Sequence, residues 1–259
     1  MPDALRSLVE AIAGGSVEVV DLTQPLSERT PIIMLPPPFA NTPGWAQREI
    51  SHYDERGPAW YWNSFEGGEH VGTHFDAPIH WVTGKDKDDV STLPLQRVIG
   101  PAVVIDKSAE CAENPDYLLS IDDIREFESA QGPLPEHGWL LYRTGWDARA
   151  QDQQEFLNAD QAGPHTPGIA IDCARWLAEE SPIVGIGTET VGTDAGQAYA
   201  FEPAFPVHSF MLGAGKYGVP QLANLASLPP TGAVFMALPL RIEGGSGSPV
   251  RAVALVSRA

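Results

Sequence analysis

Residues 69–81 read Glu69-His70-Val71-Gly72-Thr73-His74-Phe75-Asp76-Ala77-Pro78-Ile79-His80-Trp81, and they hold three histidines and one aspartate within eleven residues. All four of these side chains lie at even-numbered positions. Because side chains of an extended chain alternate between two faces, the four would share one face, with small and apolar residues on the other. Clustered imidazole and carboxylate groups of this kind indicate a metal site.

A straight strand would not bring the four groups to one ion. His74 and Asp76 would be separated by roughly 6.6 Å, which allows them to converge, whereas His70 would lie roughly 13 Å from His74. Metal–ligand bonds of about 2.0–2.2 Å therefore require a bend, and Gly72 is the residue that permits one. Pro78 ends strand pairing, so the last histidine can turn back toward the ion.

Two alternatives compete with a metal-binding strand. A helical His-x-x-x-His pair is disfavoured by Gly72, by the β-branched Val71 and Thr73, and by Pro78. A purely structural role would bury three histidines and an aspartate on one face without charge compensation, which is costly. We therefore favour the metal site.

Composition restricts the class of protein. The chain has 259 residues and a net charge of −18, from 34 acidic against 16 basic side chains, which disfavours nucleic acid and anionic membranes as partners. Cys111 and Cys173 are far apart and predict free thiols in a reducing compartment. We expect no signal peptide and no transmembrane span, and therefore a cytoplasmic protein. Without a repeat or a composition break, residues 1–259 are expected to form one domain.

Apolar periodicity predicts an α/β protein. Helices are expected over residues 4–13, with Asp3 as cap, around Ile121–Phe127, with Ser120 and Asp123 as a cap, and over 170–177. Strands are expected over 17–22, 101–106, 139–142, 183–187, 234–238 and 250–256, with a turn over 244–249. Residues 30–60 contain many prolines and predict a long irregular loop or arm that acts as a lid or as an interface.

Aromatic residues surround the histidine-rich stretch. Trp60, Trp62, Phe65 and Trp81 could line a pocket that holds a flat aromatic substrate, and we add Phe39 of the preceding loop to this substrate-binding set. Core packing is the competing interpretation for each ring.

Four histidines lie outside the stretch. His52 and His137 occupy polar or loop contexts and are expected to face solvent. His165 lies in a turn-rich loop and receives no role. His208 is flanked by apolar residues, so a core position and a place in the site both stay open.

The motif His70-x-Gly72-Thr73-His74-x-Asp76-x-Pro78-x-His80 resembles the signature of the metal-dependent cyclase-like hydrolases, a family that includes bacterial kynurenine formamidases and isatin hydrolases. The similarity extends to Asp21–Leu26, to Phe205–Gly215 and to Gly244–Ala254, and so spans nearly the whole chain. It implies the cyclase-like fold, a mixed β-sheet with a barrel-like core flanked by helices.

The resemblance also implies residue roles. His70, His74 and Asp76 would be metal ligands, His80 would be the acid/base, and His208 would be a second histidine at the site. The formamidase branch carries a glutamate at the position that reads Pro220 here, followed by Gln221. This departure makes a second metal doubtful, leaves Gln221 as a weak oxygen ligand, and favours the isatin hydrolase branch.

We therefore expect hydrolysis of a C–N bond in a cyclic aryl amide, with one divalent ion, Mn²⁺ or Zn²⁺, and with His80 transferring the proton. An arylformamidase acting on N-formylkynurenine is the alternative within the family. A non-haem iron oxygenase, which also uses two histidines and one carboxylate, and a non-catalytic metal or ligand binder are alternatives of other classes. The resemblance and the proline-rich arm favour a homodimer or a larger homo-oligomer.

Overall fold

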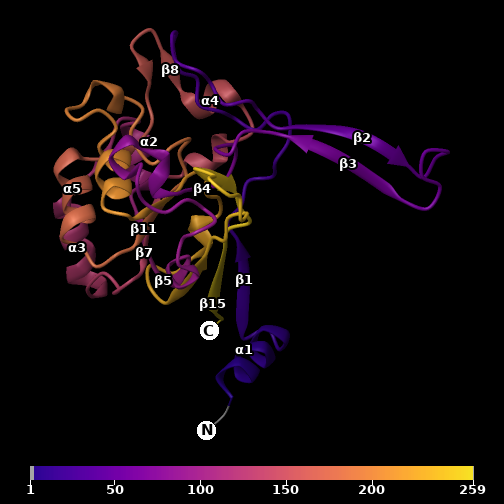
Figure 1. Cartoon of the computed structure of the whole chain (residues 1–259). Coiled ribbons are helices and arrows are strands. Elements are labelled where there is room, and N and C mark those ends of the chain that lie inside the picture. The colour runs from indigo at the N-terminus through magenta and orange to yellow at the C-terminus, as the bar shows by residue number, and fades with distance from the viewer. Residues whose placement is uncertain (1–2, 259) are drawn as a thin grey trace.

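A curled nine-stranded sheet organises the chain in the computed structural model, which describes residues 3–258 (Figure 1). In order across the sheet, the strands are β1 (Val17–Asp21), β15 (Val253–Ser257), β13 (Ala233–Met236), β5 (Ile99–Asp106), β7 (Trp139–Arg143), β11 (Gly185–Thr188), β12 (Tyr217–Val219), β4 (His74–Asp76) and β14 (Gly247–Pro249). The neighbouring strands from β5 to β12 in this order run parallel to one another, and the remaining pairs are antiparallel.

The central strands are apolar on both faces because both faces are covered. In β7, Trp139 and Leu141 point into one hydrophobic cluster, and Leu140 and Tyr142 point into another. The second cluster is closed by helices α3 (Ile121–Gln131) and α5 (Ile171–Glu179), which lie together on the outside of the sheet in Figure 1. The predicted cap of α3 is confirmed, because the side chains and backbones of Ser120 and Asp123 bond reciprocally.

The first cluster lies on the inner face of the curl. It joins Val20 of β1 to Phe75 of β4, although these strands stand near opposite ends of the strand order. A flat sheet could not place both side chains in one core, so the sheet wraps around this cluster. The predicted α/β fold, a mixed sheet with a barrel-like core flanked by helices, is confirmed.

Two N-terminal elements extend from this core. Helix α1 (Ala4–Ala13) is capped by Asp3, whose carboxylate accepts from the Leu5 amide, as predicted. Strands β2 (Ala46–His52) and β3 (Tyr61–Glu66) form an antiparallel hairpin, called the arm below, that projects away from the body (Figure 1). The expected arm is present, but an irregular loop over all of 30–60 is wrong for 46–52. That segment lies between Pro43 and Pro58 and contains no proline, so its backbone can pair fully with β3.

The closing segment also differs from the expected turn. Residues 247–249 form β14 and pair with β4, so only the first part of 244–249 turns. The following strand begins at Val253 rather than at Val250. The glycine at 247 permits the pairing, because a Cβ there would lie 2.5 Å from His70 Cε1 and 2.7 Å from the Phe75 carbonyl oxygen.

Shorter elements complete the described residues. None of the helices in residues 3–258 combines the length and the apolar character that a membrane crossing requires. The shorter helices and strands are α2 (Ser108–Glu113), α4 (Gln153–Leu157), the pair β6 (Leu118–Leu119) and β10 (Gly168–Ile169), and the pair β8 (Ala159–Asp160) and β9 (Gly163–Pro164).

Candidate metal centre

Strand β4 fixes two of the predicted ligands. His74 and Asp76 lie on one face of this strand, which is buried between β12 and β14. Phe75 points the opposite way into the inner cluster, where its ring lies 5.1 Å from that of Tyr217. Over these three positions, polar and apolar side chains therefore alternate between the two faces of the strand, as the sequence predicts.

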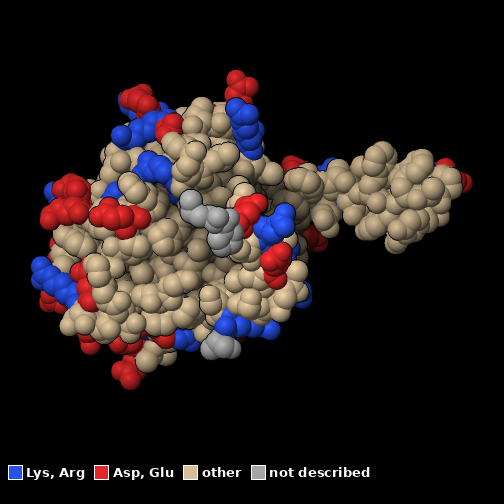
Figure 2. Space-filling model, turned by 90° about the horizontal axis from the view of Figure 1, so that it is seen from below, with Lys and Arg blue, Asp and Glu red and all other residues tan. Residues whose placement is uncertain are grey.

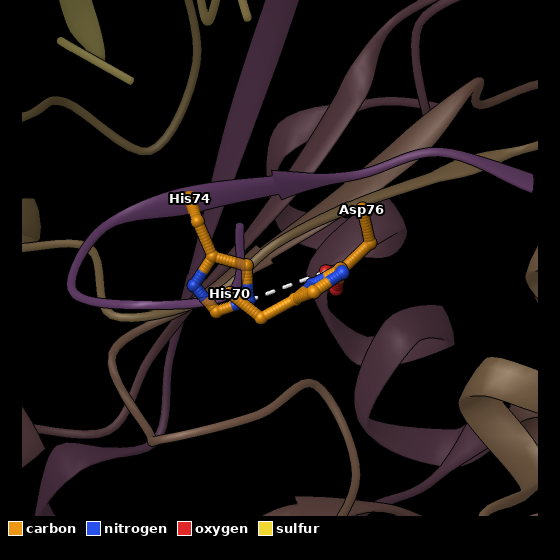
Figure 3. Close-up of side chains that lie close together, drawn as sticks. All are labelled: His70, His74 and Asp76. Carbon is orange, nitrogen blue, oxygen red and sulfur yellow. Dashed lines mark hydrogen bonds and ion pairs between the residues drawn. The ribbon is translucent and has the colours of Figure 1, made fainter. Parts of the chain in front are cut away.

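A bend returns His70 to the same point. Gly72 has φ of +63°, and a Cβ at this residue would lie 2.5 Å from Leu26 Cδ2. His70 Nδ1 lies 2.9 Å from Asp76 Oδ1, and His74 Nε2 lies 3.2 Å from the same oxygen (Figure 3). The bend at Gly72 is confirmed. Within the motif only residues 74–76 form a strand, so the extended face is limited to these positions.

The cluster fits a divalent ion. One ligand atom from each of His70, His74 and Asp76 lies within 4.8 Å of the other two. Two atoms that each bind an ion at about 2.1 Å lie about 3.0–3.4 Å apart in tetrahedral or octahedral geometry, close to the separations found here. Two imidazoles and one carboxylate are also the donor types that Zn²⁺ and Mn²⁺ accept.

Electrostatics favour a cation at this point. Burial by itself raises the pKa of Asp76, but the neighbouring His74 and the hydrogen bond from His70 hold that pKa well below its usual value. The carboxylate is therefore ionised while only 1% of its residue surface is exposed. A buried carboxylate needs positive charge beside it, which a bound metal ion supplies.

The ring nitrogens that face away from Asp76 have partners of their own. His74 Nδ1 lies 2.7 Å from the Gly72 carbonyl oxygen, and His70 Nε2 lies 2.8 Å from Ser246 Oγ. Metal-binding histidines usually donate their second ring N–H to such an acceptor, which fixes the ring orientation.

His80 lies beside the ligands rather than among them. Pro78 begins a short 3₁₀ helix, Pro78–His80, that ends the strand and turns the chain as predicted. The His80 ring stacks on that of His70, with centroids 3.8 Å apart and an angle of 26° between the planes. Burial lowers the pKa of His80 to about 3, so its imidazole is neutral at neutral pH.

His208 belongs to the same group of rings. It begins the π-helix His208–Leu212, and its ring centroid lies 5.5 Å from that of His80. Nε2 of His208 lies 4.0 Å from Asp76 Oδ2, and Nδ1 lies 2.5 Å from Asp194 Oδ2. Burial lowers the pKa of His208, but the bond to Asp194 outweighs burial and raises it. The sequence left open whether His208 lies in the core or at the site. The structure places it beside His80 and Asp76.

Comparison with known proteins places this geometry in a family. Residues 20–195 match the protein family described as "Putative cyclase". The chain belongs to the cyclase family. The resemblance inferred from the motif around His70 and His80 is thereby confirmed.

Three relatives of this cyclase-family chain are informative. The isatin hydrolase of Roseibium aggregatum is 49% identical, over 99% of this chain and 98% of the relative. A crystal structure of an isatin hydrolase bound to the product analogue thioisatinate superimposes with a TM-score of 0.96, at 49% identity and over 98% of each chain. The kynurenine formamidase of Salinibacter ruber is 29% identical, over 71% of this chain and 74% of the relative.

Among the five predicted substrate-binding rings, Trp81 alone lies at the metal centre of its own chain. Its ring centroid is 4.9 Å from that of His208. Trp62 and Phe65 lie on β3 and Trp60 directly precedes it, so all three follow the arm away from the body, exposed at 54%, 63% and 46% (Figure 1). Phe39, in the preceding loop, is 64% exposed. A single copy of this cyclase-family chain therefore does not assemble the predicted pocket of five rings, because β3 pairs with β2 and not with the large sheet.

Gln221 contacts the motif through its main chain. The Thr73 hydroxyl donates to the Gln221 carbonyl oxygen and accepts from the Gln24 amide. The Gln221 side chain is buried; its Nε2 faces the Pro31 carbonyl oxygen at 3.5 Å, and its Oε1 has no hydrogen-bond partner among the described residues. Its assignment as a weak metal ligand stays a prediction.

Sequence reasoning missed three supporting residues. Ser246 contacts His70, Glu69 contacts Ser246, and Asp194 contacts His208. Glu69 and Ser246 are 177 positions apart, so no local pattern in the sequence joins them. The signal that could have drawn attention to Ser246 is its place in Gly244–Ala254, one of the segments that resemble the cyclase family.

Proposed function

We propose that the chain is a metal-dependent hydrolase that opens the C–N bond of a cyclic aryl amide, such as isatin, to give isatinate. The observation that carries this proposal is the cluster of His70, His74 and Asp76 with the neutral His80 stacked beside it. Identity of 49% to an isatin hydrolase over nearly the full chain supports the choice of substrate. We propose that residues 1–259 act as one catalytic domain.

The ligand set is proposed to hold one Mn²⁺ or Zn²⁺ through His70 Nδ1, His74 Nε2 and Asp76 Oδ1. When bound, such an ion polarises a carbonyl oxygen and lowers the pKa of water. The Gly72 carbonyl and Ser246 hydroxyl keep the two imidazoles turned toward Asp76. A second ion is not part of the proposal, because Pro220 stands where the formamidase resemblance requires a glutamate.

His80 is proposed to move the proton. A ring nitrogen of His80 takes a proton from the attacking water as the new C–O bond forms. The same nitrogen returns the proton to the leaving nitrogen as the C–N bond breaks, and the new carboxylic acid releases the second proton of the water to solvent, so the products are a carboxylate and an amine. The pKa of about 3 that burial gives His80 keeps the ring neutral over the neutral range, so one ring nitrogen carries a lone pair before the reaction.

His208 is proposed to contact the substrate. Asp194 accepts at His208 Nδ1, so Nε2 is directed toward the side of the cluster formed by Asp76 Oδ2. From there the imidazole can hydrogen-bond to an oxygen of the substrate or of the carboxylate product. Trp81, packed against His208, provides an apolar wall for the aryl ring.

The remaining rings are proposed to act in the site of a neighbouring copy. Trp60, Trp62 and Phe65 expose aromatic surface on the arm, which carries few charges in the view of Figure 2, and Phe39 is exposed in the loop before it. An exposed apolar patch of this kind marks an interaction surface. A homodimer or larger homo-oligomer that exchanges arms would bring these rings to a metal centre that otherwise has Trp81 alone.

The proposed location is the cytoplasm. Cys111 and Cys173 are both buried free thiols, which agrees with a reducing compartment. The excess of acidic groups leaves nucleic acid and anionic membranes outside the proposed partners.

One variant tests the proposal directly. His80→Ala should retain the metal content of the wild type and lose turnover of isatin by a factor of about 10²–10⁴, because it removes the proton-transferring group and none of the ligands. Metal per chain is measured by atomic emission, and turnover by loss of isatin absorbance.

The same assays separate the alternatives. N-formylkynurenine hydrolysed in preference to isatin would favour an arylformamidase, and turnover that requires oxygen would favour an oxygenase. A metal-loaded wild type that leaves isatin, N-formyl anilides and esters intact would be a binder. Loss of metal in His80→Ala with turnover retained would contradict the role of His80.

A further inference from the structure

A hydrogen-bonded chain runs from Glu69 through Ser246 to His70. The Ser246 hydroxyl lies 2.8 Å from His70 Nε2 and donates to Glu69 Oε2 at 2.7 Å. The Ser246 amide donates to the same carboxylate oxygen at 2.9 Å. Both donors of Ser246, its amide and its hydroxyl, thus donate to Glu69.

This arrangement fixes the proton on the imidazole. A serine hydroxyl has one hydrogen, and the carboxylate of Glu69 can only accept when it is ionised. Since that hydrogen goes to Glu69, Ser246 Oγ must accept from His70 Nε2–H. The lone pair of His70 is then on Nδ1, the atom that lies 2.9 Å from Asp76 Oδ1. A neutral imidazole and a carboxylate oxygen at this distance are two acceptors, so a cation must stand between them, either a proton on Nδ1 or a bound metal ion that takes the place of that proton.

Ser246 is held rigidly enough to act in this way. Its carbonyl oxygen accepts from the Ala77 amide at 3.0 Å, and the next residue, Gly247, is paired with Asp76 across β14 and β4. Gly247 also approaches the His70 ring so closely that a Cβ would lie 2.5 Å from Cε1. Ser246 and Gly247 therefore confine the His70 ring and contact its Nε2.

We propose that Glu69 and Ser246 are positioning residues that raise the affinity of the site for its metal ion by fixing the His70 tautomer. The proposal rests on the metal centre of the proposed function and not on its substrate. The corresponding partner of His74 is the main-chain carbonyl of Gly72, which no side-chain substitution removes. Of the two hydrogen-bond partners that orient these imidazoles, only that of His70 can therefore be removed by substituting a side chain.

The test is a metal-binding measurement. Ser246→Ala, titrated in the metal-free form with Mn²⁺ and with Zn²⁺ by calorimetry, should bind about 10–100-fold more weakly than the wild type. Glu69→Gln should also bind at least about tenfold more weakly. Its new amide can donate to Ser246 Oγ, which frees the hydroxyl hydrogen for His70 Nε2 and opposes the required tautomer.

Ser248→Ala is the matched control. Ser248 lies on β14, its hydroxyl accepts from the Leu240 amide and donates to the Pro249 carbonyl, and its hydrogen bonds do not involve His70. It should bind metal like the wild type. Thermal unfolding of each metal-free variant establishes that the fold is retained.

Two results would overturn the inference. One is Ser246→Ala with wild-type metal affinity, and the other is an equal loss of affinity in Ser248→Ala. Failure of the proposed function looks different: a wild type that binds metal but does not hydrolyse isatin would remove the substrate assignment while the Ser246 and Glu69 effects on affinity remain.

Discussion

Strand β4 and the arm both contain histidine, aromatic and acidic residues, but β4 is buried and the arm is largely exposed to solvent. His74, Phe75 and Asp76 of β4 are buried between two neighbouring strands, and each has a partner from a distant part of the chain. The arm pairs only with itself, and most residues of β2 and all but one of β3 are exposed. One chain thus brings His70, His74 and Asp76 together, whereas the rings of the arm have no core of their own chain to enter.

This difference assigns distinct tasks to the two regions. A buried, cross-linked strand can hold ligand atoms to the accuracy that metal binding needs. A projecting hairpin cannot, but its exposed rings can bury apolar surface against another copy, at about 25 cal/mol per Å². The proposed chemistry therefore depends on β4, and the proposed substrate pocket depends on the arm of a neighbour.

The largest effect is expected at Asp76. Asp76→Asn keeps the shape of the side chain but removes its charge, so the metal should bind more than about 100-fold more weakly, which exceeds the usual cost of losing an outer partner. Isatin turnover should fall to background. Metal titration and a turnover assay measure both losses.

Asp86→Asn, an exposed carboxylate outside the cluster, serves as the control and should match the wild type. Wild-type metal affinity in Asp76→Asn would remove Asp76 from the ligands. The cluster would then be a structural set of buried histidines, and the contrast between β4 and the arm would lose its functional meaning.

The next effect is expected on the arm. Trp60→Ala/Trp62→Ala should raise the dissociation constant of the oligomer by about 10–100-fold, since buried tryptophans are frequent hot spots worth about 2 kcal/mol or more. The KM for isatin should rise because the neighbour's pocket loses its rings, while metal content stays unchanged. Sedimentation and steady-state kinetics report the two effects. Leu95→Ala, an exposed apolar side chain on the body, is the control.

Mixing the two variants sharpens the comparison further. In an arm-exchanged oligomer, a copy with intact Asp76 but without the two tryptophans can receive rings from an Asp76→Asn partner. The mixture should turn over isatin with a lower KM than the tryptophan variant and faster than the sum of the two variants measured separately. Activity that stays at the sum of the separate variants would mean that the rings serve their own chain or none.

The sequence predicted features whose cause is local. The Asp3 cap, the reciprocal Ser120–Asp123 cap and the buried strand around Leu140 follow from residues a few positions apart. The bend at Gly72 was predictable because extended geometry alone keeps His70 from His74. Resemblance to the cyclase family supplied His208, which its apolar neighbours left ambiguous.

Features with distant causes were not predictable. Ser246 reaches His70 only because β14 pairs with β4, and Asp194 reaches His208 only after the sheet has curled. Strand β2 was missed for another reason. Both of its faces meet solvent over most of its length, so residues such as Arg48 and Glu49 leave no alternation of apolar and polar side chains to detect.

The smallest effect on turnover is expected at Glu189, which is buried in the body of the molecule. A change at this residue should instead alter how stability depends on pH. Glu189 follows β11 and accepts from the Thr144 and Gly145 amides at 2.8 and 2.6 Å. Burial, with a smaller contribution from Asp147, raises its pKa to about 7. The unfolded chain releases this proton near pH 4.3. Between these values the folded state retains a proton that the unfolded state has lost, so stability should fall as pH rises from about 4.5 to about 7 and then level off.

Glu189→Gln cannot ionise and keeps an oxygen that can accept from the same amides. The wild type should lose on the order of 3 kcal/mol of unfolding free energy through this group across that pH range, at about 1.4 kcal/mol per pKa unit. The variant should lack that decline, so the difference between the two melting temperatures should change steadily from pH 4.5 to pH 7. Parallel curves would mean that Glu189 is ionised throughout. Unchanged isatin turnover in the variant, measured at one pH, would show that this buried carboxyl supports the fold and does not enter the chemistry at β4.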